Sequence, residues 1–317
     1  MDYTLSRLAR SLRTAVSLLL LGAAPSLAAD VNAAYLFNLS DFDGIIPYNA
    51  ARTFVDEARG EVYVSTSGGL DIYNPSGMLT FHVDYDRELG GVYDAALDDS
   101  GNILLLTNKK GDYGIVTCNY RGEPLSSVPL RHVPPDFAEA RPGRMIVRHG
   151  EIYLVDQGGM FVVVVDADGE FIRGYDLGAM MRVSDDHRPD AGLGGFTVDR
   201  DGHMLFVASS YGKACRGTLD GELAVFGKRG SSAGKFGVPG GIASDRNGNL
   251  LITDKLRAVI MIYNKEFQFV KEFGYRGTQP GNVIVPSEIT VDPVRNRVYV
   301  SQMRRRGVNI YQLSYGD

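Results

Sequence analysis

Five side chains that could hold a metal or form ion pairs stand at comparable places, each just before or within a short apolar run. The oxygens of aspartate, glutamate and asparagine are ligands that calcium prefers. A guanidinium group would instead repel a cation and attract a carboxylate. Such residues permit either a calcium site or a network of ion pairs, if the fold brings them together. They are Asn49, Arg52, Asp94, Arg144 and Glu288.

A group of lysines and arginines is concentrated in the last third of this 317-residue chain, whose formal net charge is −5. A local excess of positive charge on an acidic protein is typical of a surface that orients an acidic partner. Ordinary solvated loop charge is the alternative interpretation. We call these residues the basic group: Lys228, Arg229, Lys235, Lys255, Arg257, Arg304, Arg305 and Arg306.

The elements that would position both groups are β-hairpins, because a polar turn between two short apolar runs recurs six times. Each turn is closed by a glycine or an asparagine, which readily adopt a positive φ. The closing residues follow one another at intervals of about 41–52 residues, a spacing that indicates a repeat architecture. They are Gly60, Gly101, Gly150, Gly202, Gly248 and Asn296.

These repeats predict an all-β fold, a six-bladed β-propeller with four-stranded antiparallel blades. The last unit ends one strand short, whereas residues 33–39 precede the first hairpin and have no partner in their own unit. Pairing 33–39 with the strand near 307–313 would complete the last blade and remove an unpaired edge. Residues 30–317 are therefore expected to form a single propeller domain.

One segment carries a family resemblance. Residues 226–264, FGKRGSSAGKFGVPGGIASDRNGNLLITDKLRAVIMIYN, resemble an NHL repeat, and residues 273–311 are similar. The other units match this repeat only in their hairpin cores. An arginine that the repeat usually carries before its third strand is replaced by Val259 and Gly307. The resemblance implies an NHL-like six-bladed propeller, a class that also includes calcium-dependent lactonases and related hydrolases.

In such a ring the five residues named first would converge on the central channel, with Asp94 and Glu288 as the candidate calcium ligands. The arginines among them are poor neighbours for a cation. Blades four and five offer only glycine pairs at the equivalent places, at 194–195 and 240–241. We therefore expect a structural ring of ion pairs and no cofactor, with bound calcium as the alternative.

Function is expected on the loops, because the strands of a propeller form its core. The connections 131–144 and 175–195 are unusually long and would share one face with the basic group. The sequence therefore favours an exported, non-catalytic binding or scaffold propeller that docks a partner protein through this loop-rich face. The alternative is a calcium-dependent hydrolase or lyase of the six-bladed propeller class.

Residues 1–29 have the features of a secretory signal peptide, with three arginines before a short apolar run and small residues at 26–29. They predict a periplasmic or extracellular protein. No cysteine stands at the junction, which argues against a lipid anchor. No later apolar run is long enough to span a membrane, and the acidic net charge argues against nucleic-acid binding.

The two cysteines, Cys118 and Cys215, are predicted on the third strands of blades two and four. A disulfide needs Cα atoms within about 7 Å, which non-adjacent blades do not allow. We expect free, buried thiols. Other catalytic signals are missing from the sequence, because the histidines lack the spacing of a local zinc site and no GxSxG motif is present.

Overall fold

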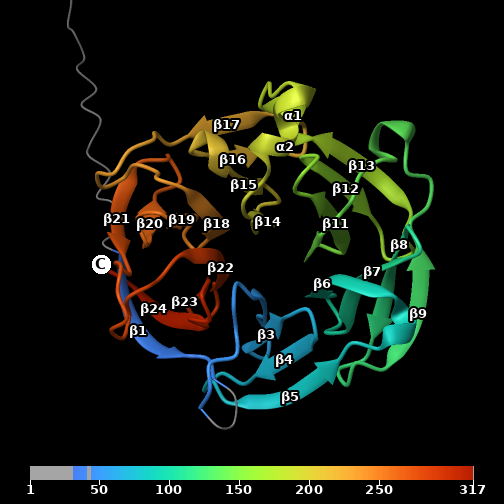
Figure 1. Ribbon diagram of the computed structural model, residues 1–317, viewed down its shortest axis with the longest axis horizontal. Helices are drawn as coiled ribbons and strands as arrows, with labels where there is room; N and C mark the ends of the chain where they lie inside the picture. Colours follow the sequence, from blue (N-terminus) through green and yellow to red (C-terminus); the bar gives the residue numbers. More distant parts are fainter. Residues whose placement is uncertain (1–30, 41–43, 317) are drawn as a thin grey trace, which may run out of the picture.

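The computed structural model describes residues 31–40 and 44–316, which form six four-stranded antiparallel sheets around a central axis (Figure 1). The prediction of a six-bladed propeller is confirmed. The proposed signal peptide, 1–29, lies outside the described residues. Within them, no helix is both long and apolar enough to cross a membrane.

The blades follow the chain in order around the ring, each from its innermost to its outermost strand. Blade one contains β2 (Arg52–Asp56), β3 (Glu61–Ser65), β4 (Gly69–Tyr73) and β5 (Leu79–Asp84). Blade two contains β6 (Gly91–Leu97), β7 (Ile103–Lys109), β8 (Asp112–Cys118) and β9 (Pro124–Pro129). Blade three contains β10 (Arg144–Arg148), β11 (Glu151–Asp156), β12 (Phe161–Val165) and β13 (Phe171–Asp176).

The second half of the ring repeats this order. Blade four contains β14 (Phe196–Val198), β15 (Met204–Ala208), β16 (Lys213–Gly217) and β17 (Leu223–Phe226). Blade five contains β18 (Pro239–Ser244), β19 (Leu250–Asp254), β20 (Val259–Tyr263) and β21 (Phe269–Phe273). Blade six contains β22 (Pro286–Asp292), β23 (Arg297–Gln302), β24 (Val308–Tyr315) and, from the other end of the chain, β1 (Val31–Asn38).

The turn between the first two strands of a blade contains a residue with positive φ and, in every blade except blade three, an aspartate. In blade two, Asp98 accepts hydrogen bonds from the backbone N–H groups of Ser100 and Asn102, both within 2.9 Å. Gly101 closes this turn at a φ of 82°, where a side chain would be strained. We call the side of the ring that carries these turns the hairpin face, and the opposite side the loop-rich face.

Blade six closes the ring as predicted. Strand β1 pairs antiparallel with β24, from Val31 opposite Tyr315 to Asn38 opposite Asn309. The pairing begins two residues earlier than expected and includes a register shift between Tyr35 and Phe37. Because β1 is the outermost strand of this sheet, the two ends of the chain are joined by one ladder of hydrogen bonds.

The core lies between neighbouring blades rather than around the channel. Between blades four and five, for example, Phe226 stacks on Phe267 with ring centroids 4.5 Å apart, and Tyr263 packs against both Phe226 and Phe236. Such contacts recur around the ring, because the two faces of each sheet pack on the adjoining sheets. The loops and the channel are therefore the parts of the molecule left for binding.

Both long connections on the loop-rich face contain short helices. The segment 131–144 includes η2 (Pro135–Phe137), and Phe137 packs against Phe161 and Phe171. The segment 175–195 includes α1 (Leu177–Met180), η3 (Asp185–His187) and α2 (Arg188–Ala191).

The second of these connections helps to form the core. Leu177, Val183 and Leu193 are buried in the cluster between blades three and four. Arg188 forms an ion pair with Asp176, with a closest contact of 2.6 Å between the side chains. These residues therefore support the fold, and only their exposed neighbours are left for contacts with another molecule.

The cysteines lie on β8 and β16, on non-adjacent blades, and both are unpaired and buried. Burial raises the pKa of Cys118 to about 11 and that of Cys215 to about 12, so both are protonated thiols at neutral pH. We expect the native protein to resist alkylation. Denaturation without a reductant should then expose both thiols and give two adducts by intact mass. A monomer with no adducts would contradict this placement of the two strands.

Candidate functional site

Four of the five residues predicted to line the channel meet near its axis. Arg52, Asp94, Arg144 and Glu288 lie on the innermost strands of blades one, two, three and six. They form two ion pairs, Arg52 with Asp94 and Arg144 with Glu288. The fifth residue, Asn49, is exposed on the loop-rich face, where its Oδ1 accepts a hydrogen bond from the backbone N–H of Arg305.

One ion pair crosses the channel. Blades three and six lie on opposite sides of the ring (Figure 1), and Arg144 on β10 reaches Glu288 on β22. Two nitrogens of the guanidinium group contact the two carboxylate oxygens at 2.6 and 3.2 Å. The side chains are only 6% and 21% exposed. We call this contact the cross-channel ion pair.

The other ion pair joins blades one, two and three. Arg52 donates to Asp94 at 3.1 Å and lies 2.9 Å from its second oxygen. Asp94 also accepts the backbone N–H of Met145 at 2.7 Å, and Arg52 donates to the Met145 carbonyl at 3.3 Å. The carboxylate of Asp94 is therefore held by one guanidinium group and one amide.

The two ion pairs differ in electrostatics. Burial would raise the pKa of Glu288, but the Arg144 guanidinium outweighs burial and holds this pKa below its ordinary value. Burial raises the pKa of Asp94 and lowers that of Arg52, and in both cases burial outweighs the attraction between the partners. Arg144 also lowers the pKa of Arg52, because the two positive charges are close. In this part of the channel two arginines face two carboxylates, Asp94 and Glu288.

This donor set does not fit calcium. Both candidate ligands, Asp94 and Glu288, are already bound by guanidinium groups through both of their oxygens. A calcium ion there would have two arginines as its nearest neighbours, which opposes binding of a cation.

Beyond this layer of charges, a cavity of about 510 Å³ extends toward the hairpin face. The innermost strands of all six blades line it, and Arg52, Arg144 and Glu288 form its inner end. This cavity could not be predicted from the sequence, because its lining residues run from the inner strands into the hairpin turns and look like ordinary turn residues. One feature of the sequence does point to it: two arginines, Arg148 and Arg200, stand beside the turns of blades three and four.

Glycine pairs allow close contact between the inner strands of blades four, five and six. A Cβ atom on Gly195 would lie 2.6 Å from the Cα of Gly241, and one on Gly241 would lie 2.8 Å from the Ile289 nitrogen. A hydrogen bond of 2.6 Å joins the Gly195 N–H to the Gly240 carbonyl. The glycines noted in the sequence thus have a packing role, and the charged side chains of the channel come from blades one, two, three and six.

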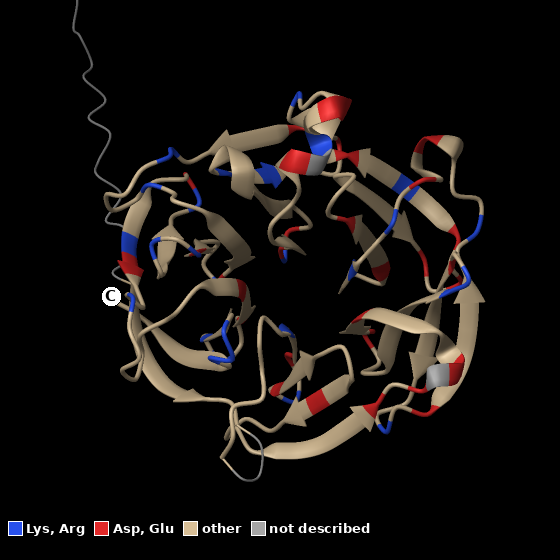
Figure 2. Cartoon of the chain, in the orientation of Figure 1, with Lys and Arg blue, Asp and Glu red and all other residues tan. Residues whose placement is uncertain are grey.

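The basic group lies in the connections of the loop-rich face that lead into or belong to blades five and six. Figure 2 shows lysine and arginine positions in blue among both signs of charge around the ring. Its members differ in what they can offer to a partner. Arg257 forms an ion pair with Glu272 at 2.8 Å and donates to two backbone carbonyls, so it supports the fold. Arg306 is half-buried and faces the Thr278 carbonyl. Exposed members are Lys228, Arg229, Lys235, Arg304 and Arg305, and Lys255 is half-buried.

Exposed apolar side chains surround the basic group, a feature that the sequence analysis missed. Leu256 and Tyr275 are more than half exposed, and Met303 and Val238 are also exposed. All four lie on connections of the loop-rich face between β17 and β24. Apolar side chains that alternate with arginine are typical of protein interfaces. Only the exposed fraction in a folded structure distinguishes these residues from core residues of the same type.

Together, the fold and the channel define a six-bladed β-propeller with a bridged channel and one basic, partly apolar face. No protein-family model matches the chain. Virginiamycin B lyase from Staphylococcus aureus is similar in structure, at 16% identity and a TM-score of 0.52, with 90% of this chain and 88% of that chain covered.

Two further solved structures are similar. A luciferin-regenerating enzyme has 14% identity and a TM-score of 0.57, over 90% of this chain and 97% of its own. An auxiliary nutrient binding protein from Bacteroides ovatus has 13% identity and a TM-score of 0.60, over 90% and 77%. These proteins include both enzymes and a binding protein, so the likeness shows the propeller fold alone.

Proposed function

We propose that this protein is a non-catalytic binding propeller that docks a partner protein through its loop-rich face over blades five and six. The observation that carries the proposal is the exposed set of basic and apolar side chains there, which includes Arg304, Arg305, Leu256 and Tyr275. The chemistry fits a partner with an acidic surface and a few apolar side chains that insert between the basic residues.

Backbone contacts hold this surface in place. The Lys255 N–H donates to the Val238 carbonyl at 2.9 Å, and the Met303 N–H donates to the Val285 carbonyl at 3.1 Å. These bonds join each turn to the neighbouring connection between blades. A surface fixed in advance loses less conformational entropy when a partner binds.

We also propose membership of the NHL-repeat class on the basis of blades five and six. The connections that lead into them contain the same isolated parallel bridge, Arg229 with Phe236 and Arg276 with Val283. Both bridges follow a glycine with positive φ, Gly227 at 93° and Gly274 at 101°. The proposed site of action is the periplasm or the extracellular space, as the leader-like residues 1–29 suggest.

The enzymatic alternative, a calcium-dependent hydrolase or lyase, has less support. Its expected ligands, Asp94 and Glu288, are occupied by guanidinium groups. We therefore argue for binding rather than catalysis at this propeller.

Reversing two exposed charges should weaken the proposed association. Arg304→Glu/Arg305→Glu leaves out Arg306, because that side chain contributes to the fold. We expect affinity for the partner to fall about tenfold or more at low salt, since both attraction and steering are lost. The difference should shrink at higher salt, where surface charges are screened.

The measurement begins with capture of partners from a native envelope fraction by the tagged protein, followed by affinity measurements on the partner identified. The matched control is Arg121→Glu/Lys265→Glu, which reverses two exposed charges in turns on the hairpin face. It should bind like the wild type. Equal binding by wild type and Arg304→Glu/Arg305→Glu at low salt would rule out docking through this group.

A further inference from the structure

The cavity on the hairpin face is separated from the proposed docking surface by the layer of ion pairs that spans the channel. Its volume of about 510 Å³ lies within the range of pockets that hold small organic molecules. Among the described residues, its lining ends at Arg52, Arg144 and Glu288 and includes none of the loop-rich face beyond them. The cavity therefore opens on one side of the ring only.

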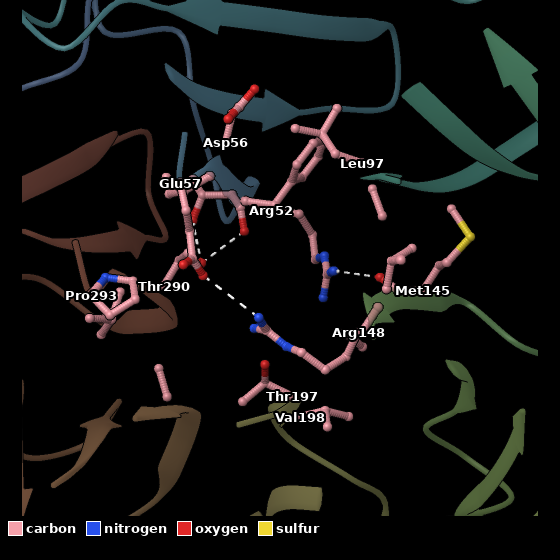
Figure 3. A pocket seen from close by; sticks show the side chains of 18 of the residues that line it. Arg52, Asp56, Glu57, Leu97, Met145, Arg148, Thr197, Val198, Thr290 and Pro293 are labelled. Atoms are coloured by element: carbon pink, nitrogen blue, oxygen red, sulfur yellow. Dashed lines mark hydrogen bonds and ion pairs between the residues drawn. The ribbon is translucent and has the colours of Figure 1, made fainter. Parts of the chain in front are cut away.

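Two arginines reach into this cavity from different blades. Figure 3 shows the guanidinium groups of Arg52, from the inner end, and Arg148, from the last residue of β10, pointing into the central space. Their side chains are 22% and 29% exposed. Both are thus partly withdrawn from bulk water. A hydrogen bond to a charged group is stronger in such a partly buried place than on an open surface.

The guanidinium group of Arg148 has little negative charge beside it. Arg148 contacts only one carboxylate oxygen of Glu57, at 3.6 Å, and Arg200 binds the same carboxylate more closely, at 2.8 Å. At the inner end the charges balance, because Arg52 is paired with Asp94 and Arg144 with Glu288. Because Arg148 and Arg200 share the single carboxylate of Glu57, this cluster has one more positive than negative charge.

The remaining acidic side chains of the lining lie at the rim. Asp56, Asp98 and Asp199 each accept two backbone N–H groups within their own hairpin turn. Asp99 is exposed at the tip of the turn in blade two. Negative charge is therefore placed at the opening, whereas Arg52 lies at the inner end and Arg148 points inward.

We propose that this cavity binds a small organic molecule through a carboxylate held by Arg148, whose Nε is buried and has no hydrogen-bond partner among the described residues. A planar guanidinium group presents paired N–H donors that match the two oxygens of a carboxylate. The wall of the cavity is mainly polar but also includes small apolar side chains, among them Ala96, Ala243 and Ile289. The Thr197 side chain also points into this space (Figure 3) and supplies a hydroxyl group for a polar substituent.

Binding of carboxylates tests this inference directly. Glutarate, benzoate and citrate are titrated into the full protein at low ionic strength, by calorimetry or ligand-observed NMR. We expect saturable binding of at least one probe, and no binding of the neutral amides glutaramide and benzamide. Arg148→Gln should weaken binding about tenfold or more, because a charge-assisted pair of hydrogen bonds is lost.

Two further variants locate the effect. Thr197→Leu fills part of the cavity without a change of charge and should also weaken binding. Arg121→Gln removes an exposed arginine from the turn between β8 and β9 and should leave binding unchanged. The proposal would be overturned by failure of all three carboxylates to bind at millimolar concentration, or by equal affinity in Arg148→Gln and wild type. Binding of the amides as tight as that of the acids would overturn the carboxylate assignment.

Discussion

Replacing Glu288 by glutamine is expected to lower the free energy of unfolding by about 3–5 kcal/mol. The substitution leaves Arg144, which is only 6% exposed, without its charged partner across the channel. A buried charge that has lost its partner is much more costly than a missing surface ion pair. Equilibrium denaturation in urea, monitored by tyrosine fluorescence, measures the change.

A double replacement separates the cost of an unpaired charge from the loss of packing. In Arg144→Met/Glu288→Gln neither charge remains, and most of the lost stability should return, since neutral replacements for a buried pair are often tolerated. As a matched control, Arg200→Gln removes an exposed partner of Glu57 and should cost less than about 1 kcal/mol. A cost just as small for Glu288→Gln would show that water in the cavity screens the cross-channel ion pair.

The effect of Glu288→Gln should also depend on pH. Arg144 lowers the pKa of Glu288 in the folded state, despite the opposing effect of burial. The stability contributed by this carboxylate is therefore complete above the unfolded pKa of about 4.3 and is lost as pH falls through the lower folded value. Wild type and variant should differ most at neutral pH and converge on acidification. A difference that grew in acid would contradict this assignment.

Deleting strand β1 should cost about 5 kcal/mol or more, which is comparable to the whole stability of many domains. The deletion uncovers the edge of β24 along its length. It also removes the buried Val31 side chain and the edge-to-face contact of Tyr35 with Tyr311, whose ring centroids are 5.9 Å apart. Thermal and urea denaturation of chains that begin at residue 30 and at residue 40 measure the difference.

A peptide provides the matching control for that deletion. Residues 30–40 added in trans should bind the shortened chain and restore part of its stability, because the open edge of β24 can accept a strand. A shortened chain that melted like the longer one would contradict closure of the ring by β1.

The sequence predicted the ring because its local chemistry repeats. Each hairpin turn has its own closing residue, such as Gly101, and the unpaired run at 33–39 matched the incomplete last unit. Arg52, Asp94, Arg144 and Glu288 could be assigned to the channel because each stands early in an innermost strand.

Contacts between distant side chains could not be predicted in the same way. The pairing of Arg144 with Glu288 depends on the width of the ring, which close contacts between glycines such as Gly195 and Gly241 help to set. The loops indicate where the basic group lies, yet only the fold shows that Arg257 is held by Glu272. The cavity remained hidden because turn residues and lining residues look alike in sequence.

Closure of blade six by both ends of the chain also determines when folding can finish. Val31 in the first described strand pairs with Tyr315 in the last one. Blades one to five are each built from consecutive strands, but blade six needs β1 and β24, which lie far apart in the sequence and must meet late in folding. A chain in which β24 has not yet formed therefore exposes β1 without a partner, and chaperones and proteases can recognise such an unpaired strand edge.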